Sequence, residues 1–471
     1  MAIAEDPAAW RQSTLPLAFV LIAAGSFEIL HKLHDARWLV WPLAAFLFAV
    51  PIIGWRRMGR REAVLLAIVA VLSVLIWLFL PAPLPRLQAG FEQASFMMAF
   101  VLFLGQLHEA ASRSPALAEL GAMLTRQAKS KRDSLIFIAS GALSVFFSVG
   151  VASFLIPIFR LGLARSVLPD AASESAEFRR QIVAMLRGHG GSILWSPTAL
   201  APLTLLMILP GIDRVKLFGL GVLFFFLLVP FSLLFTRHRP VTALVPPPAI
   251  PAAARRRALW GCAAAAGIYM ALIAAFAIAL DCEMVLAMMI ASPTMLFGWV
   301  LWQEKGKPQA AALGAARIRG ILFREIPASA PVAVTMAASG FIGRVAGEFV
   351  PAGFLTDVLH IHALPDPILL SLIPPLFCAF SLMSLSPIVL VTFFGGLFAG
   401  LDPVPADPTL LAVAICCGCT AAITFSPLAP TVLVSQRISG ISATVLTWKW
   451  NLAYTLGFMA MLVPFFWLMA G

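Results

Sequence analysis

Ser196-Pro197-Thr198-Ala199-Leu200-Ala201-Pro202 lies inside one apolar segment of the chain, and Ser426-Pro427-Leu428-Ala429-Pro430 lies inside another, 230 residues further on. Proline has no backbone N–H and its ring clashes with the preceding turn, so each stretch is expected to interrupt a helix midway. Unwound backbone exposes carbonyl groups that can hold a cation, and the half-helix that follows directs its positive N-terminus at an anion. The two stretches therefore predict a matched pair of helix interruptions that bind an ion or the solute.

The composition places these breaks in a membrane. Of the 471 residues, 61% are hydrophobic and 12% are charged, whereas a soluble domain is about 45–50% apolar and about 25% charged. The net charge of +11 comes from basic residues scattered between apolar segments, which argues against nucleic acid as a partner. The first apolar segment, Thr14–Leu33, has no basic lead-in and no small-residue cleavage site, so we expect a retained helix.

We expect an all-α polytopic membrane protein with about eleven transmembrane helices, because a segment of about 20 apolar residues can cross the hydrocarbon layer. The predicted spans are Thr14–Leu33, Trp38–Trp55, Ala63–Leu80, Phe91–Leu107, Gln181–Leu209, Val215–Phe235, Ala258–Leu280, Glu283–Trp302, Pro327–Ala346, Thr409–Val434 and Asn451–Ala470.

Two further apolar stretches are too long for one helix and contain helix-breaking residues. Residues 134–163 include Gly141, Ser148 and Gly150, and residues 367–401 include Pro374, Pro375 and Pro387. We expect each stretch to form a re-entrant hairpin. Irregular backbone at membrane depth is tolerated only where protein or a water-filled cavity covers it, so such hairpins are expected to line a site.

The basic loops predict the orientation, since Lys and Arg accumulate on the cytoplasmic side. With a cytoplasmic N-terminus and both hairpins returning to their starting side, most basic residues fall inside and the C-terminus is periplasmic. The protein is thus expected in a bacterial inner membrane. The loops that sort in this way contain Arg56-Arg57, Lys131-Arg132, Arg179-Arg180, Arg255-Arg256-Arg257, and Arg317 with Arg319.

Short matches between the two halves predict an internal repeat. Gly188 matches Gly418 at the same offset of 230 that relates the two Ser-Pro stretches, and Phe147-Ser148 matches Phe380-Ser381. The domain organisation expected is a first helix within residues 1–36, a first repeat at 37–236, a linker rich in Pro, Ala and Arg at 237–257, and a second repeat at 258–471. Five crossings and one hairpin per repeat would place the copies in opposite orientations, as in alternating-access transporters.

Hydroxyl groups, prolines and one histidine are the residues expected to bind the solute or a coupling ion. Ser, Thr and Gly are also common in membrane helices for packing alone, but their repetition at both breaks and both hairpin tips favours a functional role. His189 stands beside the first break and could bind an anion or relay a proton. The predicted set is Ser148, Ser153, His189, Ser196, Pro197, Thr198, Ser381, Ser384, Ser386, Thr424, Ser426, Pro427 and Thr431.

Neither a catalytic centre nor a bound cofactor is expected from the sequence. Cys416-Cys417-Gly418-Cys419 lies in an apolar run without converging metal-ligand partners nearby, so these cysteines are interpreted as small packing residues. Glu28 and His31 in the first helix are interpreted as an interfacial pair.

In layout the chain resembles the ion-transporter superfamily, and most closely the divalent-anion/sodium symporter family with its eleven helices, two re-entrant hairpins and cytoplasmic N-terminus. In that family, Ser-Asn-Thr motifs occupy the hairpin tips and breaks; here Ser384-Leu385-Ser386-Pro387 and Ser196-Pro197-Thr198 stand in such places. The resemblance implies Na⁺ near Ser148 with Ser196 and near Ser384 with Ser426. It also implies a homodimer, an elevator-type motion, and stretches along the membrane surface near Leu117–Thr125 and Phe354–His360.

The function expected is secondary active transport of a small anionic solute, a carboxylate or oxyanion, coupled to Na⁺ or H⁺. One alternative is a cation/proton antiporter of the same superfamily, which would need a buried carboxylate, and neither predicted broken segment contains Asp or Glu. A second alternative is a membrane enzyme acting on lipid-linked substrates, which would place His, Asp or Glu clusters at one membrane face. The hydroxyls and prolines at predicted midplane depth favour the transporter.

Overall fold

The computed structural model describes residues 7–34, 36–125, 129–147, 150–164, 170–236, 251–346, 349, 361–382 and 387–470. Within these residues every regular element is a helix, which confirms the all-α prediction. Eight helices are long and apolar enough to cross a membrane, or nine if Ala310–Ala328 and Ala330–Val345, bent by 53°, form one span. These described helices are those of a polytopic membrane protein.

The two remaining predicted spans are helices of other lengths. The span expected at Trp38–Trp55 is α2 (Val40–Ile53), which has 14 residues, and the span expected at Phe91–Leu107 is α4 (Pro83–Gly105), which has 23 residues. Both helices are present, but their ends differ from the predicted ones because hydropathy alone does not locate a helix end.

Each predicted hairpin stretch contains two helices. Residues 134–163 fall in α7 (Lys129–Phe147) and α8 (Val151–Ala164), and residues 367–401 fall in α17 (Asp366–Ser381) and α18 (Pro387–Ala399). A helix–break–helix arrangement is what a hairpin requires. Their re-entrant course in a membrane stays a prediction.

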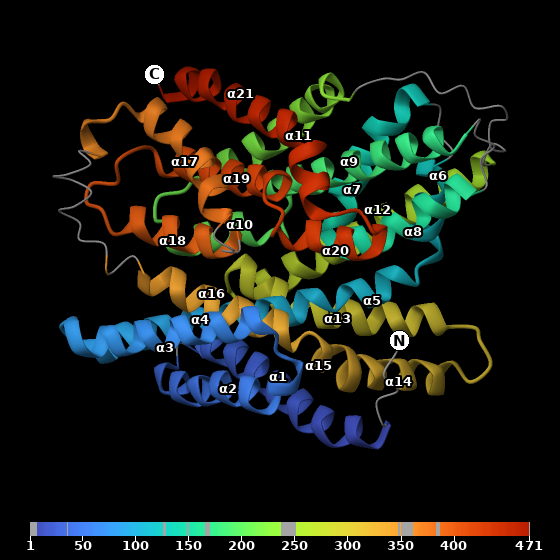
Figure 1. Ribbon diagram of the computed structural model, residues 1–471. Coiled ribbons are helices and arrows are strands. Elements are labelled where there is room, and N and C mark those ends of the chain that lie inside the picture. The colour runs from blue at the N-terminus through green and yellow to red at the C-terminus, as the bar shows by residue number, and fades with distance from the viewer. Residues whose placement is uncertain are drawn as a thin grey trace. The chain divides into compact units, whose positions relative to one another are not determined.

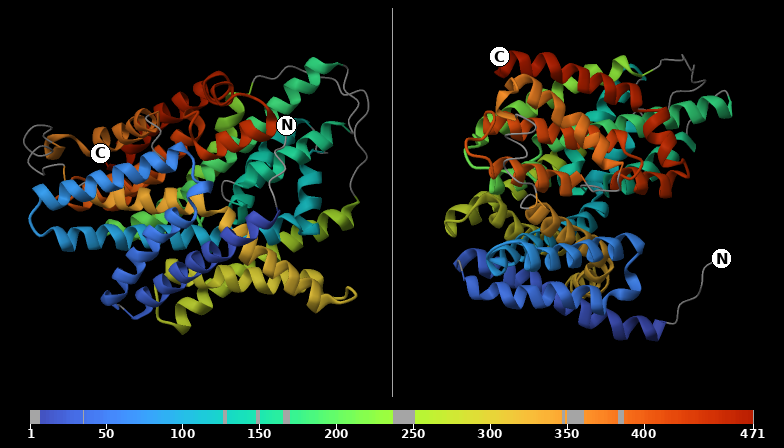
Figure 2. Two further views of the ribbon diagram at one scale, coloured as in Figure 1. Left: turned by 60° about the horizontal axis from the view of Figure 1, so that its bottom comes forward. Right: turned by 60° about the vertical axis from the view of Figure 1, so that its left-hand side comes forward.

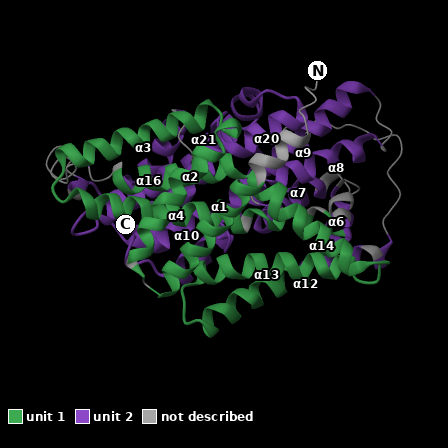
Figure 3. Cartoon of the chain, turned by 90° about the horizontal axis from the view of Figure 1, so that it is seen from below, with its two compact units in different colours: residues 1–114, 263–346 green, residues 115–262, 347–471 purple. Residues whose placement is uncertain are grey.

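The chain forms two compact units, and neither is one of the sequence halves. Unit 1 consists of Met1–Ser114 with Ala263–Ala346, and unit 2 consists of Pro115–Cys262 with Gly347–Gly471 (Figure 3). Each unit thus combines a part of the predicted first repeat with a part of the second. The repeats at 37–236 and 258–471 were inferred from sequence matches, and they stay a prediction.

In unit 1, α4 is the helix around which the others pack. It contacts α1, α2, α3, α13 and α16, and α1 to α4 lie together in both views of Figure 2. Glu28 on α1 is fully buried, and its Oε2 accepts a hydrogen bond from Ser95 Oγ on α4 at 2.6 Å. Glu28 therefore lies on the face of α1 that α4 covers, and its position at a membrane interface stays a prediction. The helices of the unit are α1 (Pro7–His34), α2, α3 (Arg60–Phe79), α4, α5 (Leu107–Ser112), α13 (Met284–Glu304), α14 (Ala310–Gly320), α15 (Ile326–Ala328) and α16 (Ala330–Ala346).

In unit 2, α19 is buried along nearly its whole length and forms the centre, beside α17 and α9 (Figure 1). The helix α12 (Ala252–Ala279) begins in this unit and continues into unit 1. The other helices of unit 2 are α6 (Pro115–Thr125), α7, α8, α9 (Ala171–Trp195), α10 (Leu200–Ile208), α11 (Arg214–Leu234), α17, α18, α19 (Pro408–Phe425), α20 (Pro430–Ser439) and α21 (Leu452–Ala470).

The packing in unit 2 has a crosswise regularity. The first hairpin helices α7 and α17 pack along α9 and α19, respectively. The second hairpin helices α8 and α18 also contact α9 and α19, and each then packs against the short helix of the opposite half, α8 on α20 and α18 on α10. The second hairpin helix of each half therefore packs against the short helix that follows the break in the other half.

Aspartate side chains set the starts of the two long helices at the centre. Asp170 Oδ1 accepts a hydrogen bond from Ser173 N at 2.7 Å, and Asp407 Oδ1 accepts one from Leu410 N at 2.9 Å. Such N-caps satisfy amide groups that a helix start leaves free. Hydrogen bonds from Ser173 also hold the pKa of Asp170 below its ordinary value. The Asp170 cap explains why α9 begins ten residues before Gln181, where the sequence analysis placed its start.

Glycine allows the closest approach between the first hairpin helix and the broken helix. A Cβ atom at Gly188 would clash with the backbone oxygen of Phe137 on α7, and one at Gly418 would lie 2.7 Å from the Phe377 ring on α17. The two glycines matched in the sequence thus both face the first hairpin helix of their own half, Gly188 at its backbone and Gly418 at a side chain.

Gly188→Ala is therefore expected to destabilise the protein by about 1–3 kcal/mol, the usual cost of overpacking, because the clash is with backbone. Gly190→Ala is the matched control, since a Cβ atom there would find its nearest neighbour at 3.5 Å. Thermal unfolding of both variants in detergent measures the difference. Equal melting temperatures for the two variants would contradict the close packing of α7 on α9.

Candidate functional site

Two short interruptions divide the central helices of unit 2. The helix α9 ends at Trp195 and α10 begins at Leu200, whereas α19 ends at Phe425 and α20 begins at Pro430. The residue before a proline is pushed out of the helical region toward extended backbone. Ser196 and Ser426 accordingly have ψ values of 125° and 122°. The breaks expected at Pro197 and Pro427 are present.

The two breaks share one hydrogen-bond pattern. The backbone N–H of Ser196 and that of Ser426 each donate to the carbonyl four residues earlier, at 2.8 Å in both cases. Each serine Oγ accepts from the amide N–H two residues later, at 3.3 Å in both cases. Each serine carbonyl accepts from the N–H three residues later, at 3.0 and 3.1 Å. The breaks are therefore the same local structure, built twice.

Each break is hydrogen bonded to the end of the first hairpin helix of its own half. Thr198 Oγ1 donates to the backbone oxygen of Val145 at 3.0 Å, and Ser426 Oγ donates to the backbone oxygen of Ser381 at 3.0 Å. Ser196 and Thr198 also share a hydrogen bond of 3.0 Å between their hydroxyl groups. The hairpins therefore hold the unwound segments in place.

The half-helices after the breaks begin without caps. Their N-cap residues are Ala199 and Ala429, neither of which makes a side-chain cap hydrogen bond, and neither half-helix has an acidic residue in its first turn. Alanine is a poor N-cap, and a helix start without a capping group needs another acceptor for its amide N–H groups. The first turns are buried, with Ala201 and Thr431 at 3% and 1% exposure. Within the described part of the chain, neither start therefore has a side-chain cap at its positive end.

His189 connects the two halves at this site. It lies on α9 and is 4% exposed. Its Nδ1 is 2.9 Å from Ser144 Oγ on α7, and its Nε2 is 2.9 Å from Thr431 Oγ1 on α20. The sequence analysis singled out His189 and Thr431 separately, and the structure brings them into contact.

Hydroxyl groups also join α19 to its neighbours α9 and α21. Thr420 Oγ1 donates to the backbone oxygen of Gly190 at 3.0 Å. Thr424 Oγ1 lies 2.8 Å from Thr455 Oγ1 on α21. These two hydrogen bonds lie between buried helices, and the residues on α9 and α19 are close in sequence to the breaks.

The predicted residues divide into four groups. Pro197 and Pro427 lie in the breaks and are half-buried, while Ser153 is exposed on α8 and stands apart from the buried cluster. Ser148, Ser384 and Ser386 lie outside the described residues. The other predicted residues lie in or beside the breaks and are largely enclosed. They are His189, Ser196, Thr198, Ser381, Thr424, Ser426 and Thr431.

Arg187 is a buried residue that the sequence analysis missed. Its Nε donates to Asn451 Oδ1 at 2.8 Å, its Nη1 donates to the backbone oxygen of Ser232 at 2.9 Å, and its Cζ lies 4.5 Å from the Tyr454 ring centroid. These contacts join α9 to α11 and α21. An arginine inside an apolar segment, two residues before His189, was the available signal.

Two ion pairs fasten the beginnings of α7 and α9. Arg132 Nη1 lies 2.6 Å from Glu177 Oε1, and Arg180 Nη2 lies 2.7 Å from Asp133 Oδ2. Glu177 belongs to the first turns of α9, which the predicted segment beginning at Gln181 left out. The broken helix therefore does contain carboxylates, and the buried one, Glu177, is paired with Arg132 and Arg180.

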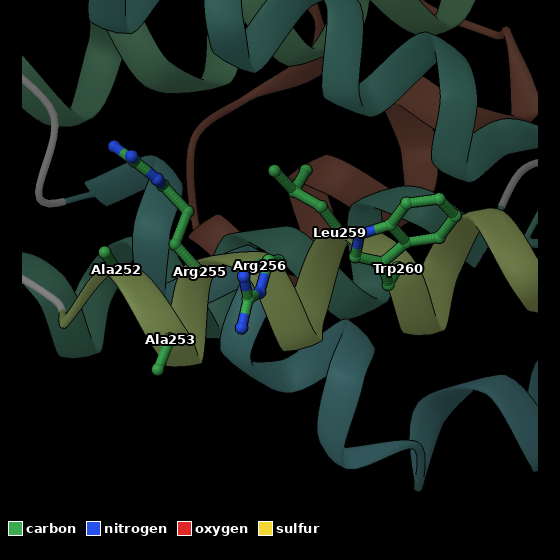
Figure 4. A pocket seen from close by; sticks show the side chains of 6 residues that line it. All are labelled: Ala252, Ala253, Arg255, Arg256, Leu259 and Trp260. Carbon is green, nitrogen blue, oxygen red and sulfur yellow. The ribbon is translucent and has the colours of Figure 1, made fainter.

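A hollow of about 510 Å³ lies at the start of α12, apart from the residues of the breaks (Figure 4). It is lined by Ala252, Ala253, Arg255, Arg256, Leu259 and Trp260. Among the described residues no group of three or more His, Cys, Asp or Glu side chains could hold a metal ion. The chemistry of unit 2 is thus concentrated in the breaks and in His189.

Two solved structures of transporters resemble this fold. The chain is similar to the YdaH transporter of Alcanivorax borkumensis, with a TM-score of 0.55 and 15% identity over 87% of this chain and 97% of that one. It is also similar to MtrF of Neisseria gonorrhoeae, from a class of antimetabolite efflux pumps, with a TM-score of 0.51 and 13% identity over 89% of this chain and 97% of that one. No family model and no curated protein sequence matches the chain. At these identities the likeness concerns the fold.

Proposed function

We propose that this protein is a secondary active transporter of a small anionic solute, a carboxylate or an oxyanion. The observation that carries the proposal is the pair of buried half-helix starts, α10 and α20, which follow identical breaks and have no side-chain caps. A helix N-terminus carries about half a positive charge and free N–H groups, which together favour an anion. The fold shared with solved transporters supports the same class.

Alternating access of elevator type is part of the proposal, with unit 2 carrying the solute. The identical hydrogen-bond patterns of the breaks support two inverted repeats, and so does the exchange of partners by α8 and α18. Inverted repeats with interrupted helices place their sites near the middle of the bilayer. A homodimer in a bacterial inner membrane, with the N-terminus in the cytoplasm, completes the proposal.

Coupling to a cation, Na⁺ or H⁺, is proposed because accumulation against a gradient needs a driving ion. The unwound backbone at both breaks leaves carbonyl groups of the kind that hold Na⁺. An antiporter that uses a buried carboxyl group is less well supported. Glu28 is such a group, but it belongs to unit 1 and is bonded to Ser95, whereas Glu177, the buried carboxylate of α9, is paired with arginine.

Efflux is the second candidate direction, because MtrF is described as belonging to a class of efflux pumps. A membrane enzyme acting on lipid-linked substrates finds no support in the solved structures that share this fold, since they are transporters. The functional experiment must therefore distinguish uptake from efflux.

Purified protein reconstituted in liposomes is expected to move at least one of radiolabelled succinate, citrate and sulfate in a saturable and gradient-dependent manner. Imposed Na⁺, H⁺ and K⁺ gradients identify the driving ion, and vesicles of both orientations separate uptake from efflux. Protein-free liposomes are the control. If protein that remains folded after reconstitution moved none of these anions in either orientation, the proposed function would be wrong.

A further inference from the structure

The hydrogen bonds around His189 define its tautomer. Ser144 Oγ donates its hydrogen to the backbone oxygen of Ser140 at 2.7 Å, so it must accept from His189 Nδ1–H. Neutral imidazole has one donor and one acceptor nitrogen. His189 Nε2 is therefore the acceptor and receives the hydroxyl hydrogen of Thr431.

Nothing charged is bonded to His189 in the described part of the chain. On α9 and α7, Arg187 bonds to Asn451, Arg132 and Arg180 pair with Glu177 and Asp133, and Arg179 stacks on Trp450. Glu174 and Lys131 are exposed near the starts of these helices. On α8, Arg160 donates to the backbone oxygen of Ser439, and on α11 Lys216 pairs with Asp407. The ionisable groups of α19 are the thiols of Cys416, Cys417 and Cys419, α20 carries Arg437, and α21 carries Tyr454, which stacks on Arg187. Within the described residues, the hydroxyls of Ser144 and Thr431 are the hydrogen-bond partners of the His189 ring.

We infer that His189 binds the proton that is coupled to solute movement, with Nε2 as the protonated atom. This inference rests on the proposed transport function and names its driving ion. A proton from solvent adds to the Nε2 lone pair, no covalent bond is broken, and Nε2–H becomes a donor to Thr431 Oγ1. Thr431 must then turn its own hydroxyl hydrogen to another acceptor.

The position of Thr431 makes this change useful. Thr431 is the second residue of α20, in the uncapped first turn where the anion is proposed to bind. The redirected hydroxyl and the new positive charge on the ring both favour an anion there. The bound anion in turn favours protonation, since coupling between two ligands is reciprocal. Proton and anion therefore bind together at one place.

Two measurements test the inference with His189→Gln, because glutamine keeps a donor and an acceptor but does not titrate. The matched control is His31→Gln, which changes another buried histidine, on α1 in unit 1. The first measurement is ¹⁵N NMR of histidine-labelled protein in nanodiscs between about pH 8 and pH 5, the range in which histidine ordinarily titrates. The signal missing from His189→Gln is expected to change from an acceptor nitrogen to N–H on acidification. A signal that stays that of neutral imidazole throughout would overturn the inference, whatever the transport assay shows.

The second measurement is accumulation of succinate and of sulfate in vesicles with an imposed pH difference. With one proton per solute and the membrane potential held at zero, one pH unit sustains about a tenfold solute gradient. The wild type and His31→Gln are expected to reach it, whereas His189→Gln should only equilibrate the solute. Tenfold accumulation by His189→Gln would refute the role of His189 and leave the transporter proposal intact. Failure of the wild type to move either anion would count against the proposed function instead.

Thr431→Val covers the case in which His189→Gln does not fold. A hydrogen bond to a charged ring is roughly twice as strong as one to a neutral ring. Loss of the Thr431 hydroxyl therefore destabilises protonated His189 more than neutral His189. The midpoint of the pH–rate profile is expected to move to lower pH. An unchanged or higher midpoint would contradict the assignment of the proton to Nε2.

Discussion

Replacing Ser196 and Ser426 together with leucine is expected to abolish anion transport, with a loss of about 100-fold or more. Each serine Oγ holds an amide N–H of its own break, and Ser426 also binds the backbone oxygen of Ser381. One such hydrogen bond is worth about 1 kcal/mol, and 1.4 kcal/mol corresponds to a factor of ten. Each single variant is therefore expected to lose up to about tenfold, and leucine at both breaks adds steric exclusion of the solute.

Initial rates of anion movement in liposomes measure this effect, with size-exclusion profiles and melting temperatures as evidence of folding. Thr294→Leu is the matched control, because Thr294 is an exposed hydroxyl residue on α13 that bonds to the carbonyl of its own preceding turn. It is expected to keep the wild-type rate. Wild-type transport by the folded double variant would show that the breaks do not bind the solute.

Replacing Arg187 with methionine is expected to lower the free energy of unfolding by about 3–5 kcal/mol. Methionine fills much of the same space but donates nothing, so Asn451 Oδ1 loses the Arg187 donor in a buried place and the backbone oxygen of Ser232 loses one of its donors. Hydrogen bonds to a charged group contribute about 1.5–3 kcal/mol each, and a buried polar atom left unsatisfied is costly. The junction of α9, α11 and α21 should then loosen.

Thermal unfolding of Arg187→Met in detergent checks this expectation. Arg256→Met removes an exposed arginine at the start of α12 and serves as its control, with no expected change in melting temperature. Arg187→Lys should recover only part of the loss, since an ammonium group does not reproduce the planar arrangement of guanidinium donors. A melting temperature of Arg187→Met equal to that of the wild type would mean that Arg187 does not hold these helices together.

The elements that could be predicted are those with local causes. Apolar segments about 20 residues long must become helices in a membrane because backbone groups find no other partners there. The proline after Ser196 and the one after Ser426 force extended backbone on the residue before them, whatever the rest of the fold does. The start of α9 was predicted ten residues late, because a cap at Asp170 on a polar first turn carries no hydropathy signal.

The sequence by itself determined the helical class, the positions of both breaks and the match between them, since each depends on residues close together along the chain. Only the tertiary structure decided that His189 meets Ser144, 45 residues away, and Thr431, 242 residues away. It also decided which faces of α1 and α9 bury Glu28 and Arg187, and that each unit draws on both halves. The physical reason is that hydropathy and proline act locally, whereas the partner of a buried polar group is chosen by packing between distant segments.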